Sequence, residues 1–151
     1  MYRKILVAYN GTPESRLALQ ECIRLEPGPA TEIHLLAVIT PQPVLLIGEF
    51  AAAAIPSEEE ERAERQAMED VLESGRSYLA DAGLRVQTRL ETGEPADIIA
   101  NMVNRLGIDL VIVGHSRHKP FALRWWRGSM DALLVEKVRC SVLVAGDPQR
   151  S

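Results

Sequence analysis

Five short apolar runs alternate with four segments of helical periodicity along this chain. The apolar runs cover residues 5–8, 33–39, 84–90, 110–113 and 141–145, and the helical patterns fill the intervals between them. Strands that alternate with helices in this way are typical of βαβ units built around a parallel sheet. The pattern predicts a single α/β domain over residues 1–151.

Local signals mark where the helices begin and end. Thr12 precedes Pro13 as an N-cap residue precedes the first helical position, and Ser57 with Glu60 has the spacing of a capping box. Pro95 opens the third helical pattern and Gly107 closes it. A last helix is expected to begin near residue 129.

The apolar runs differ in a way that predicts their places in the sheet. Residues 33–39 are nearly all apolar, as in a strand covered on both faces, whereas residues 84–91 alternate apolar and polar side chains. The third strand is therefore expected at an edge and the first and fourth at the centre. The predicted fold is a doubly wound, Rossmann-like five-stranded parallel sheet with strand order 3-2-1-4-5.

In such a sheet, ligands bind beyond the carboxyl ends of the strands, where the winding direction changes. Two loops converge there, residues 10–13 and residues 114–129. The second loop carries four basic residues and no acidic ones, which are Arg117, Lys119, Arg124 and Arg127. It is either an anion site or a solvated basic loop.

Composition narrows the classes of partner. The 151 residues carry a formal net charge of -4, which disfavours a nonspecific nucleic-acid binder. No apolar stretch approaches the roughly 20 residues that a membrane span needs. Cys22 and Cys140 form neither a metal pattern nor a disulfide framework, so a cytoplasmic protein is expected, with no nucleic-acid or membrane partner.

The histidines do not point to catalysis. His115 and His118 lack a third ligand at a suitable spacing, so no metal site is expected. The segment 114–118 is similar to a nucleophile elbow but lacks its second glycine. His34, inside an apolar strand, is expected to be a hydrogen-bonded core histidine, and no catalytic residue is assigned.

Five segments in order resemble the universal stress protein family. They are residues 4–12, 35–39, 93–95, 107–116 and 140–144, and together they span nearly the whole chain. The resemblance implies a fold of the adenine nucleotide alpha hydrolase type. In the ATP-binding branch of that family, the fourth strand is followed by Gly, two residues, Gly, nine residues and then Gly-Ser or Gly-Thr.

This chain keeps part of that pattern. Gly114 fits the first position, and Gly128-Ser129 fits the last pair. Arg117, however, stands where the second glycine is expected, and ten residues rather than nine separate it from Gly128. Asn10 replaces the usual aspartate, and Val38 matches the position whose backbone contacts adenine. The implied nucleotide-binding residues are Ala8, Tyr9, Asn10, Val38, Gly114, His115, Arg117, Gly128, Ser129 and Met130.

Two functional hypotheses follow. The first is a stress-response module that binds ATP or AMP, with Mg²⁺ accompanying ATP, and signals to an unknown protein partner; Gly128-Ser129 favours it. The second is a nucleotide-free stress protein that acts by dimerisation and protein contact; Arg117 and Asn10 favour it. At most a slow ATPase activity is expected, because only His115 or His118 could act as a general base.

The last strand, residues 141–145, is apolar on both faces and predicts a homodimer under either hypothesis.

Overall fold

The computed structural model describes residues 1–41, 57–115 and 130–146, and these form one parallel sheet flanked by helices. The strands are β1 (Lys4–Ala8), β2 (Glu32–Ile39), β3 (Val86–Thr92), β4 (Leu110–Gly114) and β5 (Ser141–Ala145). The helices are α1 (Pro13–Arg24), α2 (Glu58–Asp81), α3 (Pro95–Leu106) and α4 (Met130–Lys137).

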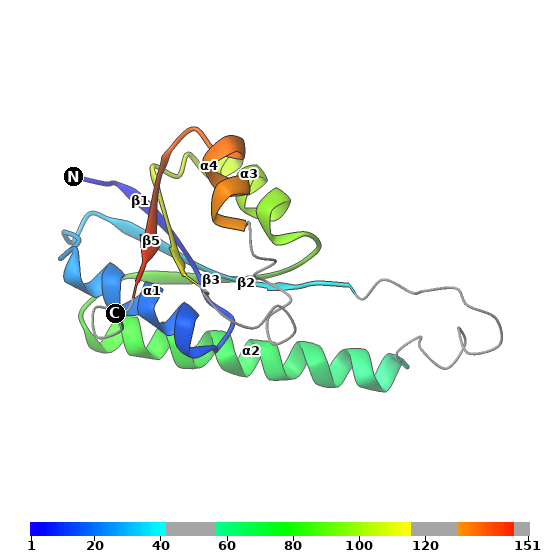
Figure 1. The fold of residues 1–151 in the computed structure, drawn as a ribbon. Helices are drawn as coiled ribbons and strands as arrows, with labels where there is room; N and C mark the ends of the chain where they lie inside the picture. The colour runs from blue at the N-terminus through cyan, green and yellow to red at the C-terminus, as the bar shows by residue number, and fades with distance from the viewer. Residues whose placement is uncertain (42–56, 116–129, 147–151) are drawn as a thin grey trace.

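The sheet is wound in both directions from β1. Within the described residues its strand order is β3-β2-β1-β4-β5, and every neighbouring pair is parallel. Figure 1 shows α1 and α2 together on one face of the sheet and α3 and α4 on the other. This arrangement confirms the predicted fold class and strand order.

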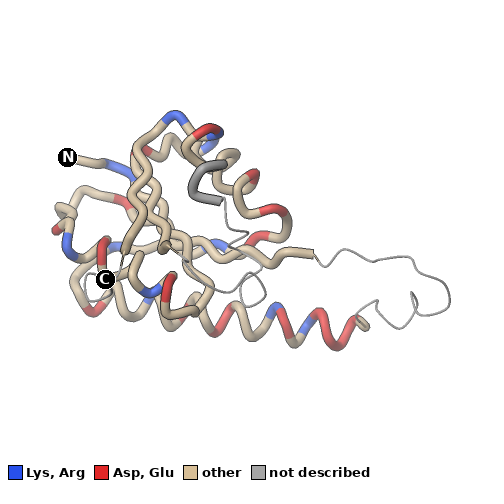
Figure 2. Tube along the Cα trace, viewed as in Figure 1, with Lys and Arg blue, Asp and Glu red and all other residues tan. Residues whose placement is uncertain are grey.

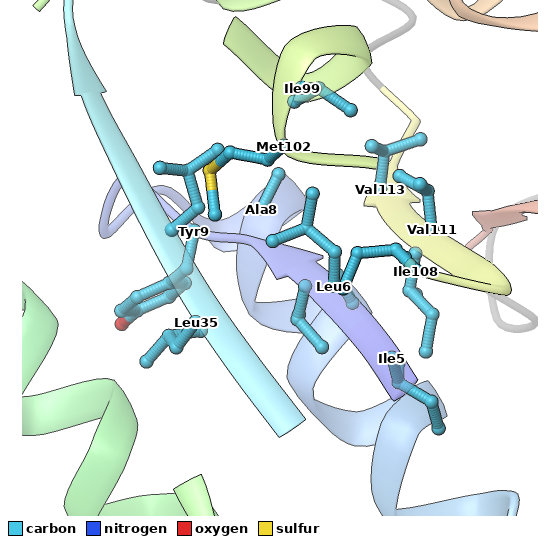
Figure 3. Close-up of a cluster of buried hydrophobic side chains, with 14 of the residues drawn as sticks. Ile5, Leu6, Ala8, Tyr9, Leu35, Ile99, Met102, Ile108, Val111 and Val113 are labelled. Atoms are coloured by element: carbon cyan, nitrogen blue, oxygen red, sulfur yellow. The ribbon is translucent and has the colours of Figure 1, made fainter. Parts of the chain in front are cut away.

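The core lies on the three inner strands. Side chains of β1, β2 and β4 are almost fully buried, and Figure 3 shows Leu6 and Ala8 packed beneath Met102 of α3. In β3, by contrast, half-buried residues are mixed with exposed ones. The alternation in the sequence therefore identified the edge strand correctly.

The helix boundaries follow the local signals. The Thr12 hydroxyl accepts a hydrogen bond from the Ser15 backbone N–H at 3.2 Å, and the Ser57 hydroxyl accepts one from the Glu60 N–H at 3.2 Å. Gly107 ends α3 in the left-handed conformation with φ of 71°. The bonds to the Thr12 and Ser57 hydroxyls each satisfy a backbone N–H that the first turn of a helix leaves unpaired.

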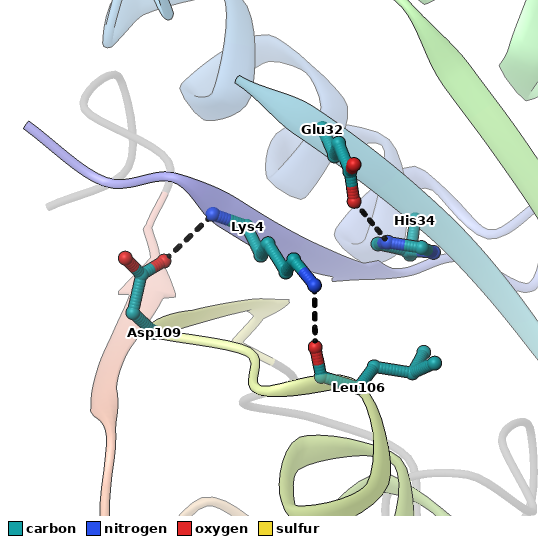
Figure 4. Close-up of polar contacts among 5 residues, drawn as sticks. All are labelled: Lys4, Glu32, His34, Leu106 and Asp109. Carbon is teal, nitrogen blue, oxygen red and sulfur yellow. Dashed lines mark hydrogen bonds and ion pairs between the residues drawn. The ribbon is translucent and has the colours of Figure 1, made fainter. Parts of the chain in front are cut away.

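One carboxylate joins the amino ends of β1 and β4. The Asp109 side chain accepts hydrogen bonds from the backbone N–H groups of Arg3 and Lys4, at 2.8 and 2.9 Å. The Lys4 ammonium donates to the Leu106 carbonyl at the end of α3, at 3.0 Å (Figure 4). These bonds hold the central strand pair and α3 together opposite the predicted ligand crevice.

His34 is buried without the hydrogen bonds that were expected of it. Its side chain is 5% exposed, and among the described residues neither ring nitrogen has a hydrogen-bond partner. Its Nε2 lies 3.6 Å from the Glu32 carboxylate, an ion-pair distance that applies only to the protonated ring (Figure 4). The expectation of a hydrogen-bonded histidine was wrong, because the Glu32 carboxylate beside it lies beyond hydrogen-bond distance.

Helix α1 packs directly on the carboxyl end of β4. A Cβ placed on Gly114 would lie 1.9 Å from the Glu14 carbonyl oxygen and 3.1 Å from the Ser15 Cα. Both neighbours are backbone atoms of the first turn of α1, so no side-chain rotation can make room. Glycine at position 114 therefore allows the β1–α1 turn and the end of β4 to touch.

We expect Gly114→Ala to lower the free energy of unfolding by at least about 2 kcal/mol, because the added methyl overlaps backbone atoms. Urea denaturation followed by circular dichroism would measure the loss. Gly146→Ala is the matched control, since a Cβ at Gly146 meets no described atom within 4 Å and should change stability by less than about 0.5 kcal/mol. Equal stability of the two variants would contradict this packing.

We expect His34 to reduce stability in mild acid. Burial lowers the pKa of His34, Glu32 opposes that shift, and Arg89 and Lys4 add to it. The unfolded chain therefore takes up a proton below about pH 6.5 that the folded chain resists, so stability falls as pH falls. The stability of the wild type minus that of His34→Leu should decrease between about pH 7.5 and 5.5 in urea titrations. An increase would mean that the ion pair with Glu32 outweighs burial.

Candidate functional site

The carboxyl ends of three strands meet at one edge of the sheet. Ala8 pairs with Leu36 of β2, and Val7 pairs with Ile112 of β4. Val38 and Gly114 each lie two residues further along their strands, so both stand past the end of β1. The fold thus brings the described candidates Ala8, Val38 and Gly114 to the same end of the sheet, where the ligand crevice was predicted.

Several predicted site residues cannot be placed. Arg117, Gly128 and Ser129 lie outside the described residues, as do residues 42–56 and the rest of the basic loop. Met130 is described only as the first residue of α4. His115 follows β4 directly, and its backbone N–H donates to the Ala145 carbonyl at 2.9 Å.

The turn after β1 is held by a network of short polar side chains. The Asn10 side-chain oxygen accepts from the Thr12 N–H at 3.2 Å and from the Thr12 hydroxyl at 2.7 Å. The Asn10 N–H donates to the Ser15 hydroxyl oxygen at 3.3 Å, and that hydroxyl donates to the Thr12 carbonyl at 3.0 Å. Ser15 is fully buried, and only the fold revealed its part in fixing this turn.

Asn10 gives the turn a neutral amide. Its oxygen is used within the turn, so its amide nitrogen is the side-chain donor that these bonds leave over. A carboxylate at this position would bring the charged oxygen ligands that Mg²⁺ prefers. Among the described residues, no group of three or more His, Cys, Asp or Glu is arranged to hold a metal ion.

Val38 presents backbone hydrogen-bonding groups to the crevice. In a parallel ladder, successive residues direct their N–H and C=O groups to opposite neighbours. The Leu36 carbonyl accepts from the Tyr9 N–H at 2.9 Å, and the Ile39 carbonyl accepts from the Gly93 N–H beside β3 at 3.0 Å. Val38 therefore directs its N–H and C=O toward the β1 side, where β1 has already ended at Ala8.

Tyr9 contributes its backbone to the crevice but not its ring. The ring packs against Gly75 of α2, where an added Cβ would lie 2.7 Å from a ring carbon. Figure 3 shows the Tyr9 side chain directed away from the Ala8 and Met102 cluster, toward the ribbon of α2. The two residues that follow Ala8 thus serve opposite faces of the sheet.

The local field at the crevice favours an anion. Helix α1 begins at Pro13, immediately after the turn, so the positive end of its dipole lies beside the carboxyl end of β1. Helix α3 begins at the same end of the sheet, and its first-turn carboxylate, Asp97, is paired with Lys137 of α4. The end of the sheet therefore combines the start of α1, where a helix dipole favours an anion, with backbone groups of Val38 that no described strand pairs.

Comparison with known proteins agrees with this architecture. The universal stress protein YxiE of Bacillus subtilis (strain 168) is 25% identical over 147 residues, which cover 95% of this chain and 99% of that protein. The structure of the hypothetical protein MJ0577 matches 99% of both chains with a TM-score of 0.74 and 23% identity. The AMP-bound universal stress protein family protein At3g01520 of Arabidopsis thaliana gives a TM-score of 0.67 at 21% identity, over 97% of this chain and 93% of that one.

A family model gives the most extensive match in sequence. The model of the universal stress protein family covers residues 1–146, from before β1 to the residue after β5. It includes the β1 turn, the end of β4 and the last strand, which are the segments that build the crevice and the sheet edge. The chain belongs to the universal stress protein family.

Proposed function

We propose that this protein is a cytoplasmic stress-response module that binds ATP or AMP in the crevice between β1 and β4 and signals through a homodimer. The backbone pair of Val38 is the observation that carries the proposal. Its N–H and C=O stand beyond the end of β1 and match the N1 acceptor and N6 donor of adenine. At most a slow hydrolysis of ATP would accompany binding.

Further features support a nucleotide at this place. The α1 end favours phosphate, and the Gly128-Ser129 pair, which lies outside the described residues, keeps the sequence of a phosphate-binding helix start. A family relative of similar fold has been solved with AMP bound. No described helix has the length and apolar character that crossing a bilayer requires.

The adenine edge gives the sharpest prediction. IMP differs from AMP at this edge, where O6 and N1–H reverse the donor and the acceptor, so Val38 would face like groups. We expect AMP to bind at least about tenfold more tightly than IMP, because each mismatch leaves a polar group unpaired. Isothermal titration calorimetry with AMP, IMP and GMP would measure the difference.

Equal affinity for AMP and IMP would remove Val38 from the recognition of the base. If no nucleotide binds and native mass spectrometry of the freshly purified protein shows no adduct, the second hypothesis replaces the first. That alternative is a nucleotide-free stress protein acting through dimerisation and protein contact. Asn10 favours it, because the amide removes the carboxylate that stands at this turn in the ATP-binding branch.

The open edge of β5 supports the homodimer. Among the described strands, β5 pairs with β4 alone. The Ala145 carbonyl bonds toward β4, so the alternating pattern directs the backbone groups of Val142 and Val144 to the unpaired edge. Val144 is also 38% exposed, and an apolar strand with an open edge is normally covered.

We expect Val144→Pro to convert the dimer to a monomer, because proline removes an N–H that faces the open edge and spares the β4 ladder. Size-exclusion chromatography with light scattering would report the mass, and circular dichroism would verify the fold. Val144→Thr is the control, since it keeps the N–H and the β-branched shape and should remain dimeric. A wild type that is monomeric at micromolar concentration would contradict the proposal.

A further inference from the structure

A cleft opens between α1 and α2, on the face of the sheet opposite α3 and α4. It encloses about 370 Å³, enough for a small organic molecule. Tyr9 and Leu19 lie at its buried base, and exposed polar residues of the two helices form its walls. The nucleotide proposal uses none of the side chains that line it.

The Tyr9 hydroxyl is an unused polar group at the base of this cleft. Tyr9 is 2% exposed, and no described residue forms a hydrogen bond with its hydroxyl. The ring lies flat on Gly75, and Figure 3 shows its oxygen directed toward α2. Because Tyr9 lines the cleft, its hydroxyl is available to hydrogen-bond with a ligand or a solvent molecule there.

Opposite charges stand on the two walls. Arg16 extends from α1 and Asp81 from the end of α2, and both line the cleft. Within the described part of the chain, neither forms an ion pair, although the Asp81 charge acts on the neighbouring Arg76, which itself pairs with Glu73. Ser74 and Ser77 add hydroxyl groups on the α2 wall.

We propose that this cleft binds a small zwitterion, a free α-amino acid. Arg16 pairs with the carboxylate, Asp81 pairs with the ammonium group, and the Tyr9 hydroxyl donates to the carboxylate from below. Tyr78, which is 42% exposed, gives a ring surface for a short side chain. A ligand with both charges satisfies both walls, whereas a singly charged ligand leaves one charge unmatched.

The test is an NMR titration of the full-length wild-type protein with L-alanine, L-serine and L-leucine, following the backbone amides of Ser74, Ser77 and Tyr78. At least one amino acid should give saturable shifts at these positions. N-acetyl-L-alanine lacks the ammonium group and L-alaninamide lacks the carboxylate, so each should bind at least about tenfold more weakly. Glucose serves as a neutral polyhydroxyl probe.

Variants assign the contacts. Tyr9→Phe keeps the ring on Gly75 and should weaken amino-acid binding about fivefold, and Arg16→Met should weaken it at least about tenfold. Arg24→Met, an exposed change on the same helix outside the cleft, should leave affinity unchanged. The absence of saturable shifts with all three amino acids, equal binding of N-acetyl-L-alanine or L-alaninamide, or a preference for glucose would overturn the proposal.

Discussion

The contact between Gly114 and the first turn of α1 is the constraint on which the ligand-facing end of this fold depends. Because position 114 has no side chain, the Glu14 carbonyl comes within the volume that a Cβ would occupy. The helix that leaves the end of β1 therefore lies against the end of β4. The start of α1 and the end of β4, which are about a hundred residues apart in the chain, meet as a result. In the described residues β1 ends at Ala8, which leaves Val38 without a strand partner on that side.

That contact also defines what Gly114 does. In the family pattern, the glycine after the fourth strand is part of the nucleotide loop, where the absence of a side chain permits close approach of a phosphate. In this chain, the same absence is already required by backbone packing against α1. Packing against α1 by itself therefore accounts for a glycine at position 114. In the proposed nucleotide site, contact with a phosphate would be a second role of Gly114.

Tyr9 and Asn10 show how one strand end can serve two sites. Asn10 is held in a turn fixed by Thr12 and Ser15, while the Tyr9 ring packs against Gly75 of α2. The proposed nucleotide would lie beyond the carboxyl ends of the strands, and the proposed amino acid would lie between α1 and α2.

The sequence by itself determined the strand order, the edge position of β3 and the caps at Thr12, Ser57 and Gly107, because these depend on local periodicity and nearest-neighbour hydrogen bonds. It also predicted that the strand ends carrying Ala8, Val38 and Gly114 lie side by side, since the topology fixes which strand ends are adjacent. Only the tertiary structure decided that His34 is buried without hydrogen bonds, that Ser15 fixes the turn and that Tyr9 faces α2. Those outcomes depend on which side chains from distant segments pack together, and no local pattern contains that information.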